Sequence, residues 1–264
     1  MSASRPIGIF DSGIGGLTVV KRIEELLPHE EIIYFGDTAR VPYGTKSKET
    51  VTRFSVENVE FLMGFNVKMI IVACNTASSL SLEFLKRCFK VPLIGVIEPG
   101  AKGAVDSTRN NRIGVIGTRA TISSGAYEKA IKKLNSNISL YSQTCPLFVP
   151  LVEEGWLDED VTGDVARVYL APLKKRQIDT LILGCTHYPL LSYAIRKVMG
   201  KSMLFIDSAK EVAKEAKGIL AACGLLNGTR QRRNTKFFVS DEPDSFVSMG
   251  KRFLKRRITA KKMG

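Results

Sequence analysis

Residues 70–77 read IIVACNTA, and residues 181–188 read LILGCTHY. Each segment opens with a short apolar run, which is typical of a buried strand. Each run ends in a cysteine, Cys74 or Cys185, that directly precedes small polar residues. In a parallel α/β sheet, ligands bind where strands end and the following helices begin. The two segments therefore predict buried strands that carry chemistry at their carboxyl ends.

Similar apolar runs alternate with amphipathic stretches along most of the chain. The predicted strands are residues 7–10, 31–36, 68–73, 92–97, 112–117, 179–184 and 203–207, with a short FFVS strand at 237–240. Helical spacing of apolar residues is found at 47–65, 78–89, 120–134 and 161–175. This alternation predicts an α/β fold with mainly parallel sheets covered by helices.

The chain also contains an internal repeat. IGIFDSG at 7–13 resembles IGVIGTR at 113–119, VP at 41–42 recurs at 149–150, and the two cysteine segments correspond in the same way. The offsets are 106, 108 and 111 residues. Buried strands resemble one another by chance, but three similar offsets favour a true repeat.

A true repeat predicts two similar α/β domains related by a quasi-twofold axis, with the active site in the cleft between them. We expect residues 1–97 and 208–264 to form the first domain, because the C-terminal helix and strand return to it, and residues 98–207 to form the second. NGTRQRRN at 227–234 reads as an exposed loop, and KRFLKRRITAKKMG at 251–264 as a helix end followed by a frayed tail.

The composition indicates a globular protein with a large core. Hydrophobic residues make up 44% of the 264 residues and charged residues 25%, which argues against disorder. No apolar run approaches the roughly 20 residues that a membrane span needs, and the start lacks the apolar core of a signal peptide, so we expect a cytoplasmic protein. Five cysteines in a chain of this size argue for free thiols.

The net charge of +13 is concentrated at the C terminus. Between Thr229 and the end, eleven Lys or Arg residues stand against three Asp or Glu residues. Such a stretch is compatible with a secondary contact to nucleic acid. We expect it to be dispensable for any chemistry at the cysteines.

Cys74 and Cys185 are the main candidates for catalysis. Amides at a helix N-terminus lower the pKa of a thiol and hold a carboxylate, so this position suits an acid-base thiol. The alternative is that both are ordinary core cysteines, but their matching places in the repeat favour function. Cys88 and Cys223 are expected on apolar helix faces, and Cys145 is expected to be structural.

Asp11 and Ser12 end the first predicted strand and are expected near Cys74. The Asp11 carboxylate would accept a proton or orient a substrate ammonium, although both residues are equally suited to capping the next helix. GIGG at 13–16 resembles a dinucleotide fingerprint, but its last glycine is replaced by Thr18 and Asp11 would repel a pyrophosphate. We therefore do not expect a nucleotide.

Two further elements are candidates for the site. Pro42, Tyr43 and Gly44 form a loop whose backbone can approach a ligand, or simply a turn. His187 lies two residues after Cys185, where an imidazole could serve the thiol. A zinc site is the alternative for His187, but the sequence lacks a C-x₂-C pair, so no metal is expected. Glu153, which follows the second VP, is a weaker candidate for the site. Its pattern is explained at least as well by a solvated carboxylate at the start of a helix.

The segments FDSGIGGLTVV, YFGDTARVPYG, VACNTAS, GVIEPG and GCTHYPLL resemble the hallmarks of the glutamate racemase family. They extend from Ile7 to Leu191 in the family's order, and only the basic C-terminal segment lies outside the resemblance. The resemblance implies a two-domain enzyme that interconverts L- and D-glutamate without a cofactor, supplies D-glutamate for peptidoglycan, and acts as a homodimer.

The resemblance also implies roles for individual residues. Cys74 and Cys185 would be the two acid-base residues, assisted by Asp11 and His187, with Glu153 as a possible further assistant. The substrate would be bound by Asp11, Ser12, Pro42, Tyr43, Gly44, Asn75, Thr76, Thr186 and His187. Inverting Cα requires a base on one face and an acid on the other, which a thiolate and a thiol can supply, while fixed donors stabilise the carbanion.

Three alternatives stay open at this point. An aspartate or other amino-acid racemase would use the same two thiols, because their arrangement does not measure side-chain length. A thiol redox protein would need a resolving cysteine within disulfide reach. A nucleic-acid-binding protein would act through its basic segment, with an affinity that falls steeply with salt.

Overall fold

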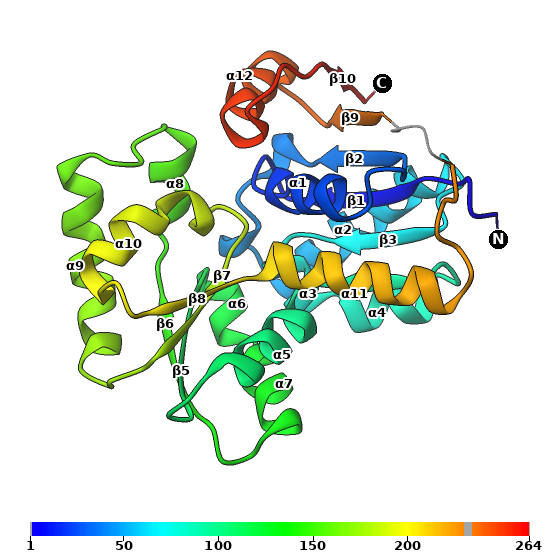
Figure 1. Ribbon diagram of the computed structural model, residues 1–264. Coiled ribbons are helices and arrows are strands. Elements are labelled where there is room, and N and C mark those ends of the chain that lie inside the picture. Colours follow the sequence, from blue (N-terminus) through cyan, green and yellow to red (C-terminus); the bar gives the residue numbers. More distant parts are fainter. Residues whose placement is uncertain (1, 230–233, 264) are drawn as a thin grey trace.

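The computed structural model describes residues 2–229 and 234–263, which form two α/β units (Figure 1). The first contains a six-stranded parallel sheet, in the order β10 (Ala260–Lys262), β9 (Thr235–Val239), β2 (Ile32–Gly36), β1 (Ile7–Asp11), β3 (Met69–Val72) and β4 (Leu93–Gly95). The second contains a four-stranded parallel sheet, in the order β6 (Ser139–Thr144), β5 (Arg112–Gly117), β7 (Thr180–Gly184) and β8 (Leu204–Asp207).

The two sheets share one topology. In the first, β1 lies between β2 and β3, and β4 follows β3; in the second, β5 lies between β6 and β7, and β8 follows β7. The strands of the sequence repeat are thus structural counterparts, β1 of β5 and β3 of β7. This confirms the prediction of an α/β fold built from two similar domains.

Helices cover both sheets, as apolar stripes facing the strands require. They are α1 (Leu17–Leu26), α2 (Lys48–Met63), α3 (Asn75–Leu80), α4 (Leu82–Cys88), α5 (Ile97–Ser107), α6 (Arg119–Ser123), α7 (Ala126–Leu134), α8 (Phe148–Glu153), α9 (Asp160–Lys174), α10 (Ser192–Met199), α11 (Ser208–Ala222) and α12 (Pro243–Leu254). Short 3₁₀ turns occupy Thr38–Arg40, Tyr43–Thr45 and Tyr188–Leu191.

Two predicted helices are each divided in two. The helix expected at 78–89 is split into α3 and α4 at Ser81, and α3 starts earlier, directly after Cys74. The helix expected at 120–134 is split into α6 and α7 at Gly125, whose φ of 65° is left-handed. Glycine adopts this conformation without steric cost, so helical periodicity did not reveal the break.

The C-terminal segment is part of the first unit. Strand β9 pairs with β2 and, on its other side, with β10, and α12 packs against α1. Figure 1 shows these three elements along one edge of the unit. The frayed tail expected after α12 was wrong, because Ala260–Lys262 form a strand held by backbone pairing. Of the loop expected at 227–234, residues 230–233 lie outside the described residues.

Helix α11 joins the units, since it follows β8 of the second sheet and lies against α1 of the first and against α5. Apolar side chains of both units form one buried cluster around the junction, so the two sets of strand ends are held together by packing. In the described part of the chain, no helix combines the length and apolarity required to cross a bilayer.

Candidate active site

The carboxyl ends of β1, β3 and β7 meet at one small cavity between the units. It is lined by residues of both: Ser12, Val41, Pro42, Tyr43, Gly44, Cys74, Asn75, Thr76, Thr118, Val149, Cys185, Thr186 and His187. Its volume of about 20 Å³ is little more than a single water molecule needs. The structure thus brings together both cysteines and most of the residues predicted for the substrate.

The lining follows the internal repeat. Ser12 corresponds to Thr118, Val41 to Val149, and Cys74 to Cys185 at the sequence offsets of 106, 108 and 111. Cys185 directly follows Gly184, the last residue of β7. Cys74 follows β3 after one further small residue, Ala73. The two thiols therefore reach the cavity from opposite units, at equivalent positions.

Cys74 is 5% exposed and begins α3. Burial and, after it, the nearby Asp11 carboxylate raise the pKa of its thiol to about 12, although hydrogen bonds from the Ala77 amide and the Ser12 hydroxyl favour the thiolate. At neutral pH the Cys74 thiol is accordingly protonated.

Cys185 has different surroundings, because His187 is its neighbour. The Cys185 Sγ atom lies 3.8 Å from His187 Nδ1, and His187 Nε2 lies 3.2 Å from Glu153 Oε1. Burial alone would lower the pKa of His187, but the hydrogen bonds and charges of Cys185 and Glu153 raise it to about 10. The Cys185 sulfur thus lies beside an imidazole that is charged at neutral pH.

Asp11 is fully buried and does not line the cavity. Its Oδ2 accepts a hydrogen bond from the Gly13 amide at 3.1 Å, and its Oδ1 accepts one from the Thr186 hydroxyl at 3.3 Å. Burial raises the pKa of this carboxyl, and His187 opposes the shift. Neither Asp11 nor Glu153 lines the cavity. Asp11 is hydrogen-bonded to Thr186, and Glu153 to His187, and these two partners do line it.

The loop with Pro42, Tyr43 and Gly44 lines the cavity from the first unit. The hydroxyl of the buried Tyr43 donates to Asp37 and accepts a hydrogen bond from Asn58 at 3.0 Å. Asp37 also accepts one from Arg40 at 2.6 Å. The buried Tyr43 side chain therefore holds the loop in place, and its hydroxyl proton is used in the hydrogen bond to Asp37.

Two glycines let the units approach closely. A Cβ atom on Gly15 would lie 2.2 Å from Thr186 Oγ1 and 2.6 Å from His187 Nδ1, and one on Gly44 would lie 2.5 Å from Thr118 Cβ. The GIGG segment therefore makes room for the residues after Cys185, which explains its glycines without a dinucleotide.

Sequence reasoning missed Thr118, Val41, Val149 and Gly15. Three of them could have been found from the repeat, since Thr118 is the counterpart of Ser12, and Val149 and Val41 open the two VP pairs. Gly15 carries no signal beyond its glycine-rich context. Cys88 and Cys223 are exposed, which corrects the apolar helix faces expected for them, whereas Cys145 is buried.

Comparison with known proteins agrees with this architecture. The Asp/Glu/Hydantoin racemase family matches residues 7–216. A glutamate racemase from Geobacter metallireducens is 53% identical over 250 residues, which cover 95% of this chain and 93% of the relative. This chain belongs to the glutamate racemase family. The prediction of an amino-acid isomerase is thereby confirmed, and the match also extends into the basic C-terminal segment.

Solved structures of the glutamate racemase family superpose closely on the chain. RacE1 from Bacillus anthracis has a TM-score of 0.96 at 42% identity, covering 98% of this chain and 97% of its own. The enzyme from Francisella tularensis, solved in complex with D-glutamate, has a TM-score of 0.92 at 41% identity, covering 99% and 98%. An aspartate racemase from Picrophilus torridus, at 19% identity and a TM-score of 0.58, shares the fold alone.

Proposed function

We propose that this member of the glutamate racemase family interconverts L- and D-glutamate by a two-base transfer of the α-proton between Cys74 and Cys185. The observation that carries the proposal is that both thiols line one cavity from equivalent positions in opposite units. That arrangement suits a substrate whose Cα lies between them. A thiol redox role is disfavoured, because the family to which the chain belongs is one of racemases.

The surroundings of the two thiols suggest how the first step runs. Cys185, beside the His187 imidazolium, is suited to remove the α-proton as a thiolate, and the protonated Cys74 is suited to deliver one to the opposite face. The reverse reaction exchanges these roles. Glu153 acts through its hydrogen bond with His187, and Asp11 acts through its hydrogen bond with Thr186.

The carbanion formed between the two steps needs fixed donors. The Asn75 Nδ2 atom is buried and lacks a hydrogen-bond partner in the part of the chain that the structure describes, while its Oδ1 accepts one from Tyr127 at 2.7 Å. The hydrogen bond from Tyr127 thus fixes the orientation of the Asn75 side-chain amide, and the Asn75 Nδ2 group is left to donate to a substrate carboxylate. The Thr76 and Thr118 hydroxyls and the amides of Tyr43 and Gly44 complete this set of donors, whereas the Thr186 hydroxyl donates to Asp11.

A cavity of about 20 Å³ cannot hold glutamate, so we infer that the units separate to admit it. The proposed moving bodies are residues 1–97 with 208–264, and residues 98–207; each contains one complete sheet. Closing would then exclude water from the reacting carbon. The supply of D-glutamate for peptidoglycan, the cytoplasmic location and the homodimer remain predictions from the family resemblance.

Circular dichroism of L-glutamate tests the proposal. Wild-type protein should abolish the optical signal, and Cys74→Ser or Cys185→Ser should slow this loss by at least about a hundredfold, as expected for removal of a proton-transfer group. Cys88→Ser and Cys223→Ser are matched controls, because both cysteines are exposed, and should behave like wild type. A Cys74→Ser or Cys185→Ser variant with wild-type turnover would refute the proposal, and faster turnover of L-aspartate would favour the alternative substrate.

A further inference from the structure

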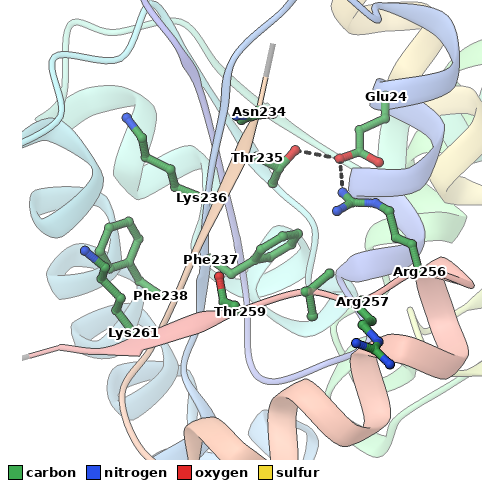
Figure 2. Close-up of a pocket in the computed structure, with 11 residues that line it drawn as sticks. Glu24, Asn234, Thr235, Lys236, Phe237, Phe238, Arg256, Arg257, Thr259 and Lys261 are labelled. Carbon is green, nitrogen blue, oxygen red and sulfur yellow. Dashed lines mark hydrogen bonds and ion pairs between the residues drawn. The ribbon is translucent and has the colours of Figure 1, made fainter. Parts of the chain in front are cut away.

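A second, larger hollow lies on the first unit, between β9 and the chain that joins α12 to β10 (Figure 2). Its volume is about 690 Å³. It shares no residue with the cavity that holds the cysteines. The lining residues are Glu24, Asn234, Thr235, Lys236, Phe237, Phe238, Arg256, Arg257, Ile258, Thr259 and Lys261.

The groove exists because β10 pairs with only part of β9. Ala260 is the partner of Phe237, and the pairing continues toward Val239, so Thr235 and Lys236 have no partner on β10. The chain between α12 and β10 diverges from this half of β9 and leaves the hollow. Buried Phe237 and Ile258 form apolar parts of its wall.

Four exposed cations line the groove, and its one carboxylate is already satisfied. Glu24 accepts hydrogen bonds from Thr235 Oγ1 at 2.6 Å and from Arg256 at 2.5 Å. Lys236 pairs with Glu31 at 2.7 Å. Arg257 and Lys261 have no acidic partner within residues 2–229 and 234–263. The groove therefore carries a positive charge that its own residues do not neutralise.

The positive surface extends beyond the groove. Lys251, Arg252 and Lys255, at the end of α12 and just after it, are exposed, whereas the apolar side chains of the same helix, Phe246 and Phe253, are buried. Binding to a membrane surface usually requires exposed apolar anchors together with cations. Among the residues that line the groove and those at the end of α12, the cations are exposed and no large apolar side chain is, which fits a hydrated polymer of regular negative charge.

We propose that this groove and the adjoining end of α12 bind the phosphate backbone of nucleic acid. Lys236 and Lys261 lie toward one side of β9 in Figure 2 and Arg256 toward the other, so cations are presented on both sides of the strand edge. The contact is independent of racemisation, because none of these side chains lines the catalytic cavity.

The test is fluorescence anisotropy of a labelled duplex of about 20 base pairs with the full-length protein. Four phosphate contacts predict that the affinity falls roughly a hundredfold between 50 and 200 mM salt. Arg257→Glu with Lys261→Glu should weaken binding at least about tenfold and reduce the salt slope by about two. Lys174→Glu with Lys175→Glu is the matched control, since both residues are exposed on the second unit and the charge change is equal.

The control variant should bind like wild type within about twofold, and both double variants should racemise glutamate at the wild-type rate. Equal weakening by the two double variants would show that only net charge acts, and would overturn the proposed groove. Absence of duplex binding at 50 mM salt, or binding to vesicles containing phosphatidylserine in preference to the duplex, would overturn it as well.

Discussion

At the scale of single residues, the two catalytic candidates have the same side chain in different surroundings. Cys74 is buried beside the Asp11 carboxylate, which keeps the pKa of its thiol high, at about 12. Cys185 instead lies beside His187, whose pKa of about 10 keeps the imidazole charged at neutral pH. The two thiols therefore lie beside different groups, a buried carboxyl group at Cys74 and an imidazolium at Cys185.

Glu153→Gln should shift the pH dependence of racemisation. Glu153 contributes to the raised pKa of His187, so its removal lowers that pKa, and the activity lost as the imidazolium deprotonates should disappear at lower pH than in wild type. We expect kcat at neutral pH to fall by up to about tenfold. Profiles of kcat/KM between about pH 6 and pH 11 measure the shift.

Glu154→Gln is the control for this prediction, because Glu154 is the exposed neighbour of Glu153. Its profile should coincide with that of wild type. An unchanged alkaline limb in Glu153→Gln would show that Glu153 does not act through His187.

At the scale of elements, the connection between β1 and α1 determines how closely the two units meet. Gly15 lies against Thr186 and His187, and Gly44 lies against Thr118, so the first unit offers two side-chain-free positions to polar residues of the second. These contacts place the residues after Cys185 beside those around Cys74.

Gly15→Ala should therefore damage the site. The new Cβ would lie 2.2 Å from Thr186 Oγ1, and relieving this clash must displace Thr186 and His187. We expect activity to fall at least about tenfold and the free energy of unfolding to fall by about 1–3 kcal/mol. Steady-state kinetics and urea unfolding provide the two measurements.

Gly218→Ala is the matched control. Gly218 lies inside α11 with open space around its Cβ position, so alanine should raise the free energy of unfolding by about 0.5–1 kcal/mol and leave activity unchanged. Wild-type activity in Gly15→Ala would contradict the role assigned to this close approach.

The sequence predicted the cysteine pair and eight of the ten strands of the described chain because their signals are local. Apolar runs marked these strands, and the repeat placed Cys74 opposite Cys185. Strand β6 was missed because its sequence, SLYSQT, contains no apolar run and no residue of it is fully buried. Strand β10 was missed because Ala260–Lys262 is only three residues long, contains no apolar run, and is held by backbone pairing with β9 rather than by buried side chains. The positions of Asp11 and Glu153 behind the cavity could not be predicted either, since they depend on contacts between side chains far apart in the sequence.

At the scale of the whole molecule, the basic C-terminal segment contributes to the core of the first unit. Phe246 of α12 is 2% exposed and stacks on Tyr34 of β2 at 5.8 Å between ring centroids. Tyr34 in turn donates to the Gly13 carbonyl at 2.7 Å, next to the residues of the site. From the sequence we expected the segment from Thr229 onward to be dispensable for chemistry at the cysteines. Its removal would take β9, α12 and β10 from the sheet and its packing, so we now expect that truncation to reduce racemisation.

Phe246→Ala measures this contribution. Loss of a buried phenyl ring should lower the free energy of unfolding by about 3–5 kcal/mol. Ser248→Ala, at an exposed position of the same helix, should change it by less than about 0.5 kcal/mol. If Phe246→Ala lowered the free energy of unfolding by less than about 1 kcal/mol, α12 would not contribute to the core of the first unit.

The transfer of hydrogen through two separate sulfur atoms is tested most directly by racemising L-glutamate in deuterium oxide and stopping at low conversion. We predict that the D-glutamate formed carries deuterium at Cα, because Cys74 supplies a solvent-derived proton, while the remaining L-glutamate keeps its original hydrogen. D-glutamate that retains the substrate's own hydrogen would show a single group acting on both faces, and would contradict the two-base transfer.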